Sequence, residues 1–304
     1  MKTLLVLAGG PDAEREVSLF SARAIADAVA ASGRYSVNHQ VIDHITIPRL
    51  KALKGDIIWP ALHGPFGEGG PMQDLLEQDG RPYVGCGPRA ARLAMDKVAS
   101  KCFAALAGLN VQPTCILKPD EPGLPLPLPV VLKPIFEGST IGLFICRTES
   151  EWRAGYDAAC NSGKPYMIEP FVKGHELTLG LVDRGIPGAA LKALPWIHIV
   201  PAEGLYDYEA KYTREDTVYR IDPELPPDVK EKTARQVENL ARLMDIRHLC
   251  RADFILDDEN RAWFLEINTM PGFTGHSLVP KAAQQIGLDM PKLCAHLVDR
   301  ADQP

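Results

Sequence analysis

Long apolar runs are missing from this 304-residue sequence, and so are paired cysteines and clustered histidines. Glycine, proline or charge interrupts every apolar run before the roughly 18 residues that a membrane-spanning helix needs, so we expect no membrane partner. The amino-terminal run extends only from Leu4 to Ala8. A signal peptide has an apolar region of roughly 7 to 15 residues, so this run is better interpreted as a buried strand.

The seven cysteines form no CxxC pair, and the eight histidines form no HxH or HExxH pair. Scattered cysteines in odd number indicate free thiols in a reducing compartment, which predicts a cytoplasmic protein. Without paired histidines, a zinc site built from neighbouring ligands is not expected.

Excess positive charge is also absent, because 33 basic residues against 39 acidic ones leave a net charge of −6. A mildly acidic total argues against a nucleic-acid partner. Hydrophobic residues make up 46% of the chain, which is enough for a sizeable core. A specific site for a small molecule is therefore the better prediction.

The first part of the chain alternates short apolar runs with helical patterns, which predicts parallel strands joined by helices. We expect strands at 3–7, 37–42 and 56–62, and helices at 18–31 and 72–78. Glycine-rich segments follow the first and third of these strands, GGPDAERE and LHGPFGEGG. They would lie at the edge of the sheet where such folds bind ligands.

The rest of the chain is richer in strands. We expect strands at 130–134, 166–172 and 176–182, helices at 89–106, 149–160 and 227–244, and a hairpin formed by CRADFILDD and RAWFLEINTMPG. A proline-rich connector at 119–129 would be a surface loop. We predict an α/β protein in which a parallel-sheet domain is followed by a second domain that begins near residue 96, with two or three lobes packed round one cleft.

The predicted hairpin carries two carboxylates and an amide. Glu266 and Asn268 are two residues apart on one strand and share a face, and the hairpin can bring Asp253 beside them. Three such oxygen donors are suited to Mg²⁺ in a phosphoryl-transfer site. The alternative is a solvated face, although both carboxylates lie in otherwise apolar strands.

Lys133 ends an apolar strand, and the small-residue loop Glu137-Gly138-Ser139-Thr140 follows it. Backbone N–H groups and hydroxyls in such a loop can bind phosphate, and the lysine supplies charge. By itself such a loop is more often an ordinary hairpin turn. The sequence contains neither GxxxxGK[ST] nor an opening GxGxxG, which argues against a P-loop enzyme and a nicotinamide dehydrogenase.

Taken together, eight segments resemble the D-alanine:D-alanine ligases of the ATP-grasp superfamily. They are GGPDAEREVSL from Gly9, LHGPFGEGG from Leu62, AMDK ending at Lys97, VLKPIFEGSTIG from Val131, IEPFVKGHELT from Ile168, YDYEAKY from Tyr206, CRADFIL from Cys250 and LEINTMPGFTGHSLVP from Leu265. The resemblance implies an ATP-grasp fold, in which an amino-terminal, Rossmann-like parallel-sheet domain at 1–95 is followed by two α+β lobes at 96–175 and 176–304 that clasp ATP. It also implies ATP-dependent joining of two D-alanines, through a D-alanyl phosphate, for peptidoglycan synthesis.

The resemblance implies roles for individual residues. ATP would be held by Lys97, Lys133, Glu169, Phe171, Val172, Glu176 and Leu265. Two Mg²⁺ ions, which Mn²⁺ could replace, would be held by Asp253, Glu266 and Asn268. The first D-alanine would contact Glu14, Ser139 and Tyr212, and the oxyanion would contact Arg251 and the Gly272 amide. The second D-alanine would be held by Ser277 and Leu278, with His63 and Lys211 also contacting substrate. A homodimer is implied as well.

Several of these residues have a plainer interpretation. Glu14 could stabilise a helix N-terminus, His63 could be a core histidine, Tyr212 could pack in a loop, Arg251 could be a surface cation, and Ser277 could cap a helix. For the whole chain, the alternatives are a ligase that takes D-serine, D-lactate or another carboxylate–amine pair, and a nucleotide-binding module without catalysis. Residues 201–219 are expected to close over the substrates.

Overall fold

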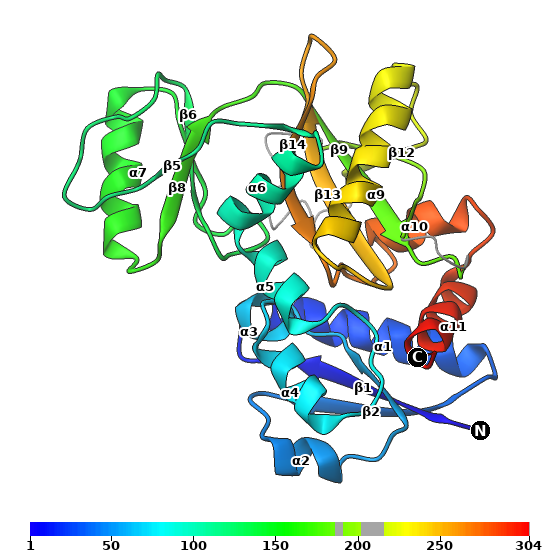
Figure 1. Cartoon of the computed structure of the whole chain (residues 1–304). Helices are drawn as coiled ribbons and strands as arrows, with labels where there is room; N and C mark the ends of the chain where they lie inside the picture. Colours follow the sequence, from blue (N-terminus) through cyan, green and yellow to red (C-terminus); the bar gives the residue numbers. More distant parts are fainter. Residues whose placement is uncertain (186–190, 202–215, 304) are drawn as a thin grey trace.

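The computed structural model describes residues 1–185, 191–201 and 216–303 (Figure 1). This part of the chain is mixed α/β and contains three separate sheets, which confirms the predicted α/β class. None of its helices is both long and apolar enough to span a membrane. The expected substrate-covering segment lies mostly outside the described residues.

The amino-terminal sheet is parallel, as its sequence predicts, with the order β2-β1-β3. Its strands are β1 (Thr3–Gly9), β2 (Ser36–Ile42) and β3 (Ile57–Pro60), and its helices are α1 (Arg15–Ala31), α2 (Ile47–Ala52), α3 (Gly64–Glu68) and α4 (Pro71–Asp79). Along β1, Leu4 and Val6 pack on the α1 side, whereas Leu5 and Leu7 pack on the side of α2 and α4. Because both faces are buried, the strand is a continuous apolar run.

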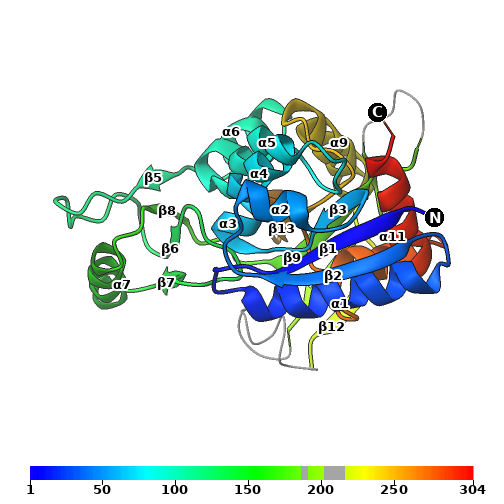
Figure 2. The same ribbon diagram turned by 90° about the horizontal axis from the view of Figure 1, so that it is seen from below.

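The carboxy-terminal end of the chain completes the first of these cores. Helices α10 (Leu278–Gln284) and α11 (Met290–Ala301) contribute buried side chains to it, and α11 lies beside α1 in both views (Figures 1 and 2). Trp59, at the end of β3, meets Phe273 edge to face with 5.2 Å between ring centroids. The loop before α10 is thereby fixed against the amino-terminal sheet.

The largest sheet has the order β12-β11-β9-β13-β14-β4, with β10 beside β9. Its strands are β4 (Asn110–Val111), β9 (His175–Val182), β10 (Lys192–Ala193), β11 (Ile197–Val200), β12 (Val218–Ile221), β13 (Leu249–Leu256) and β14 (Ala262–Asn268). Strands β13 and β14 form the predicted hairpin. The core against this sheet includes side chains from α5 (Pro88–Met95), α6 (Lys97–Leu106) and α9 (Thr233–Leu243), the last preceded by a π-helical turn, η1 (Asp228–Lys232).

The single helix predicted at 89–106 is wrong, because the structure divides it into α5 and α6. Asp96 lies between them with an extended backbone (ψ 102°), and its side chain accepts hydrogen bonds from the Val98 and Ala99 N–H groups at 2.9 and 3.0 Å. Aspartate is a strong helix N-cap. The apolar pattern continues across the break and hides it, and the cap sets Lys97 at the first position of α6.

The remaining sheet is antiparallel, with the order β5-β8-β6-β7, and forms a small lobe with its own core (Figure 2). It contains β5 (Cys115–Ile116), β6 (Val130–Pro134), β7 (Phe144–Cys146), β8 (Tyr166–Pro170) and α7 (Glu149–Asn161). Helix α7 begins with a capping box between Thr148 and Glu151.

Two consecutive residues just before β13, Arg247 and His248, bind the backbone of Gly85 in the amino-terminal part. His248 Nδ1 accepts a hydrogen bond from the Gly85 N–H at 2.9 Å, and Arg247 Nε donates to the Gly85 carbonyl at 2.9 Å. His248 is buried, with φ +69°. Burial, reinforced by the Arg247 charge, lowers its pKa to about 4, so the ring is neutral and remains an acceptor near pH 7.

Candidate active site

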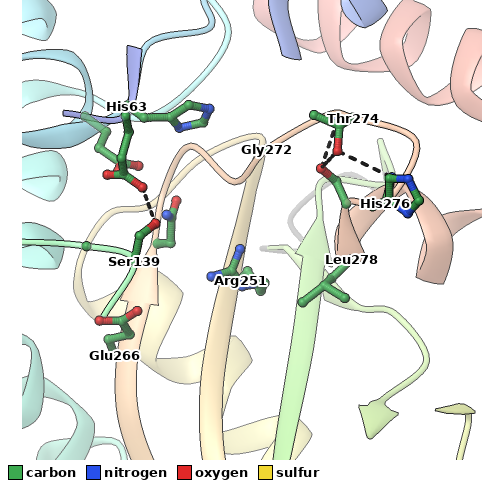
Figure 3. A pocket seen from close by; sticks show the side chains of 13 residues that line it. His63, Ser139, Arg251, Glu266, Gly272, Thr274, His276 and Leu278 are labelled. Carbon is green, nitrogen blue, oxygen red and sulfur yellow. Dashed lines mark hydrogen bonds between the residues drawn. The ribbon is translucent and has the colours of Figure 1, made fainter. Parts of the chain in front are cut away.

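Two adjoining pockets lie where the three sheets meet. The first is lined by Glu14, His63, Glu68, Gly138, Ser139, Arg251, Glu266, Asn268, Gly272, Thr274, His276, Ser277 and Leu278 (Figure 3). The second is lined by Lys97, Lys133, Pro134, Glu137, Gly138, Thr140, Ile141, Leu143, Glu176, Asp253, Leu265 and Glu266. Gly138 and Glu266 line both, so the two pockets meet at these residues.

The loop at 137–140 lines both pockets and contacts Glu14, the residue just before α1. The Ser139 hydroxyl donates a hydrogen bond to the Glu14 carboxylate, and both residues are buried (Figure 3). Ser139 and Thr140 have φ values of +53° and +64°, in the left-handed region that such residues seldom adopt. A Cβ on Gly138 would lie 3.1 Å from Glu14 Oε2. The loop does connect two hairpin strands, but its conformation is specialised for this contact.

Glu14 stands at the N-cap position of α1, yet its side chain makes no capping hydrogen bond. Glu14 therefore occupies the N-cap position of the helix, but its carboxylate accepts a hydrogen bond from Ser139 on the small lobe and none from the helix backbone. This places one acidic group at the boundary between the amino-terminal sheet and the loop.

The register of the hairpin pairs Asp253 with Glu266 and Arg251 with Asn268. Arg251 Nε and Nη2 lie 2.9 and 2.8 Å from the two carboxylate oxygens of Asp253, and the Thr178 hydroxyl donates to Asp253 at 2.6 Å. Asp253 is buried and lines the second pocket with Glu266. The solvated-face interpretation of Asp253 is thus contradicted, and so is the interpretation of Arg251 as a surface cation, because that arginine lines the first pocket.

Asn268 and Glu266, on the neighbouring strand β14, line the first pocket. The Asn268 amide oxygen accepts a hydrogen bond from the Met270 N–H at 2.7 Å, and Glu266 Oε2 lies 3.3 Å from Lys97 Nζ. Within the described ranges, no three His, Cys, Asp or Glu side chains gather as metal ligands. Two carboxylates and one amide oxygen nevertheless match the oxygen donors that Mg²⁺ prefers.

Four of the residues expected to hold ATP line the second pocket: Lys97, Lys133, Glu176 and Leu265. Lys97 Nζ donates to the Glu137 carbonyl. The other three, Glu169, Phe171 and Val172, do not line the pocket as it stands. The Phe171 N–H donates to the Pro129 carbonyl at 2.9 Å, and its ring lies under the Arg147 guanidinium at 5.8 Å.

His63 and Glu68 are buried at the two ends of the short helix α3. Burial, together with the Arg251 charge, lowers the pKa of His63 to about 4. Burial and then the Glu14 charge raise the pKa of Glu68 well above its usual value. Glu68 Oε1 accepts from the Gly64 N–H at 3.2 Å, and among the described residues its Oε2 and His63 Nε2 have no hydrogen-bond partner.

Glu68 is a pocket residue that the sequence reasoning missed. It lies in LHGPFGEGG, a segment already singled out for its glycines, and the only signal was a carboxylate inside an apolar, glycine-rich turn. Thr274 and His276 were missed as well, although they lie between two residues that were predicted.

The segment from Gly272 to Leu278 forms the far wall of the first pocket (Figure 3). Ser277 Oγ accepts from the Thr274 N–H at 2.8 Å, and the Phe273 N–H donates to Ser21 Oγ at 3.1 Å. A Cβ on Gly272 would lie 3.0 Å from Ser277 Oγ, so this tight turn favours glycine. Ser277 precedes α10 but does not cap it with its side chain.

The remaining predicted site residues, Lys211 and Tyr212, lie outside the described residues, and their placement stays a prediction. All the other residues expected to touch D-alanine or the oxyanion line the first pocket: Glu14, His63, Ser139, Arg251, Gly272, Ser277 and Leu278.

Comparison with known proteins identifies the chain's relatives. Residues 122–299 match the family model "D-ala D-ala ligase C-terminus". A D-alanine--D-alanine ligase of Bordetella parapertussis is 40% identical, over 97% of this chain and 94% of that protein.

Solved structures agree with this. The ligase of Bacillus anthracis complexed with ATP is 27% identical, with a TM-score of 0.79 over 99% of this chain and 96% of its own. The VanG D-Ala:D-Ser ligase of Enterococcus faecalis shares the fold, with 23% identity, a TM-score of 0.82 and 99% of both chains covered. The expected ATP-grasp fold and the resemblance are confirmed. The chain belongs to the D-alanine--D-alanine ligase family.

Proposed function

We propose that this protein uses ATP to join two D-alanines into D-alanyl-D-alanine, for the synthesis of peptidoglycan precursors. Family membership supports this reaction. The observation that carries it is the junction of the two pockets at Gly138 and Glu266. A lysine-lined pocket for phosphates opens there beside a pocket with acidic and basic groups for amino acids, so a phosphoryl group can pass between them.

The first step activates one D-alanine. Glu14, oriented by the Ser139 hydroxyl, binds the ammonium group and points the carboxylate toward the junction. A carboxylate oxygen attacks the γ-phosphorus of ATP, the bond to the β-phosphate oxygen breaks, and an acyl phosphate and ADP result. Lys97 and Lys133 stabilise the phosphate charge from the second pocket.

The second step forms the peptide bond. Ser277 and Leu278 hold the carboxylate of the second D-alanine. Its free amine attacks the acyl carbon, the C–O bond to phosphate breaks, the nitrogen loses a proton, and phosphate leaves. The Arg251 guanidinium and the Gly272 N–H stabilise the oxyanion. Holding both reactants in attack geometry supplies much of the rate. His63, neutral because of its lowered pKa, adds no positive charge beside the amine.

Magnesium is proposed at the hairpin. Asp253, Glu266 and Asn268 would hold one or two Mg²⁺ ions, because carboxylate and amide oxygens are donors that suit Mg²⁺ and these three come from the neighbouring strands β13 and β14. Bound there, Mg²⁺ or Mn²⁺ would offset the negative charge of the ATP phosphates.

We further propose that the enzyme is a cytoplasmic homodimer. All seven cysteines are free, which suits a reducing compartment. Light scattering at micromolar concentration tests the dimer, since a monomer mass would contradict it.

The decisive experiment measures phosphate release with ATP, Mg²⁺ and D-alanine, and identifies the product by mass. D-alanyl-D-alanine is the expected product, with L-alanine inactive as the matched control. D-serine and D-lactate are added in separate reactions together with D-alanine. A mixed product formed faster than the D-alanine dipeptide would replace the proposed acceptor, and no D-alanine-dependent phosphate release would overturn the function.

A further inference from the structure

Three buried side chains form a Lys–Glu–Lys row behind the second pocket. Lys101 Nζ lies 2.8 Å from Glu169 Oε2, and Lys133 Nζ lies 2.5 Å from Glu169 Oε1. The exposed fractions are 4% for Lys101, 3% for Glu169 and 6% for Lys133. Buried charges are stable only when paired, so the carboxylate and both ammonium groups depend on one another.

Lys101 joins two parts of the fold. It lies on α6, one turn after Lys97, and its Nζ also donates to the Phe264 carbonyl of β14 at 3.3 Å. Glu169 and Lys133 lie on β8 and β6 of the small lobe. Figure 1 shows α6 between that lobe and β14. The Lys–Glu–Lys row therefore connects the small lobe to the largest sheet, next to the second pocket.

Only one of the two lysines reaches the pocket. Lys133 lines it and Lys101 does not. Burial raises the pKa of Glu169, but Lys133 and Lys101 outweigh that effect and hold the pKa below its usual value. If Lys133 turned to a phosphate without Lys101 present, Glu169 would remain ionised and buried with no cation, a strongly unfavourable state.

We propose that Lys101 is a positioning residue of the nucleotide site, which keeps Glu169 paired when Lys133 leaves that carboxylate for the phosphates of ATP. The inference rests on the proposed function only for the identity of the nucleotide. Lys101 itself touches no substrate and acts through Glu169. Its loss should weaken nucleotide binding while leaving D-alanine recognition in the first pocket intact.

The test compares four variants of the full chain: Lys101→Met, Lys101→Arg, the double variant Lys101→Met with Glu169→Gln, and Lys118→Met. Lys118 is an exposed lysine of the small lobe that pairs with Glu121, so it controls for loss of a lysine as such. The dissociation constant of a non-hydrolysable ATP analogue is measured by calorimetry without D-alanine, and the KM values of ATP and D-alanine by steady-state kinetics.

Lys101→Met should weaken analogue binding by about 10- to 100-fold, the range for losing a charged contact, and raise the KM of ATP but not that of D-alanine. Lys101→Arg should restore part of the affinity because it keeps the charge. The double variant should bind the analogue better than Lys101→Met, because no buried carboxylate is left unpaired. It also keeps the test available should Lys101→Met fail to fold.

Two results would overturn the inference. One is a folded Lys101→Met protein that binds the analogue within about twofold of wild type, which is no more than ordinary variation between surface variants. The other is a double variant that binds no better than Lys101→Met. Failure of the proposed function is distinguishable, because it would be seen as absence of dipeptide in the wild-type protein, whatever the analogue binds.

Discussion

The hydrogen bond between Ser139 and Glu14 offers a quantitative test of how the first D-alanine is held. Both residues are 7% exposed, and the serine hydroxyl donates a hydrogen bond to the carboxylate. Hydrogen bonds to charged groups contribute about 1.5–3 kcal/mol. Ser139→Ala should therefore lower kcat/KM for D-alanine by roughly 10- to 150-fold.

A double-mutant cycle isolates the pair. Glu14→Gln removes the charge, and if the two side chains act as one unit, adding Ser139→Ala to it should cost little more. The expected coupling free energy is about 1.5–3 kcal/mol. The assay is D-alanine-dependent dipeptide formation at saturating ATP.

Controls separate this role from a general loss of folding. Ser32→Ala removes a hydroxyl that bonds to the Val29 carbonyl at the other end of α1, and it should leave kinetics unchanged. The KM of ATP should also stay constant in Ser139→Ala. A coupling free energy below about 0.5 kcal/mol, the usual error of additivity, would refute the assignment of the pair to D-alanine binding.

Three further predictions concern stability, pH and metal. Phe254→Ala empties a fully buried site between Trp196 and Phe264 and should lower the free energy of unfolding in urea by about 3–5 kcal/mol, whereas exposed Phe20→Ala should change it by less than about 0.5 kcal/mol. The pKa of His248 in the folded protein, about 4, lies below the value of about 6.5 expected in the unfolded chain. Between pH 6.5 and 4 the unfolded chain therefore binds more protons, and the free energy of unfolding decreases as the pH falls through that window. His248→Asn keeps a hydrogen-bond acceptor and tolerates the left-handed backbone. It should reduce the dependence of the unfolding free energy on pH by up to about 1.4 kcal/mol per pH unit. An unchanged pH dependence in urea titrations would contradict the assignment of this effect to His248. Chelation of divalent cations should abolish dipeptide formation, and adding Mg²⁺ or Mn²⁺ should restore it. Glu266→Gln should raise the Mg²⁺ concentration for half-maximal rate at least about tenfold. If wild type and Glu266→Gln need the same Mg²⁺ concentration, Glu266 is not a metal ligand.

Local patterns were enough to predict most of the elements. The continuous apolar run of β1 and the alternation of strands and helices after it indicated a parallel sheet, because a strand buried on both faces has no polar side. The hairpin of β13 and β14 followed from its turn residues, and its register set Asp253 opposite Glu266. The break at Asp96 escaped notice because a cap is a single-residue signal within a helical pattern.

The sequence by itself determined the fold class, the family and most of the residues around the first pocket, because motifs in fixed order specify which side chains are available. Only the tertiary structure decided which partner each of these polar or charged side chains has. Glu14 bonds to Ser139 rather than to its own helix, and Arg251 is paired with Asp253. Glu68 and Lys101 became visible only once burial was known. The physical reason is that the cost of a buried charge, and the partner that offsets it, depend on how the folded chain packs, which often brings together segments that are far apart in the sequence, such as Glu14 and Ser139.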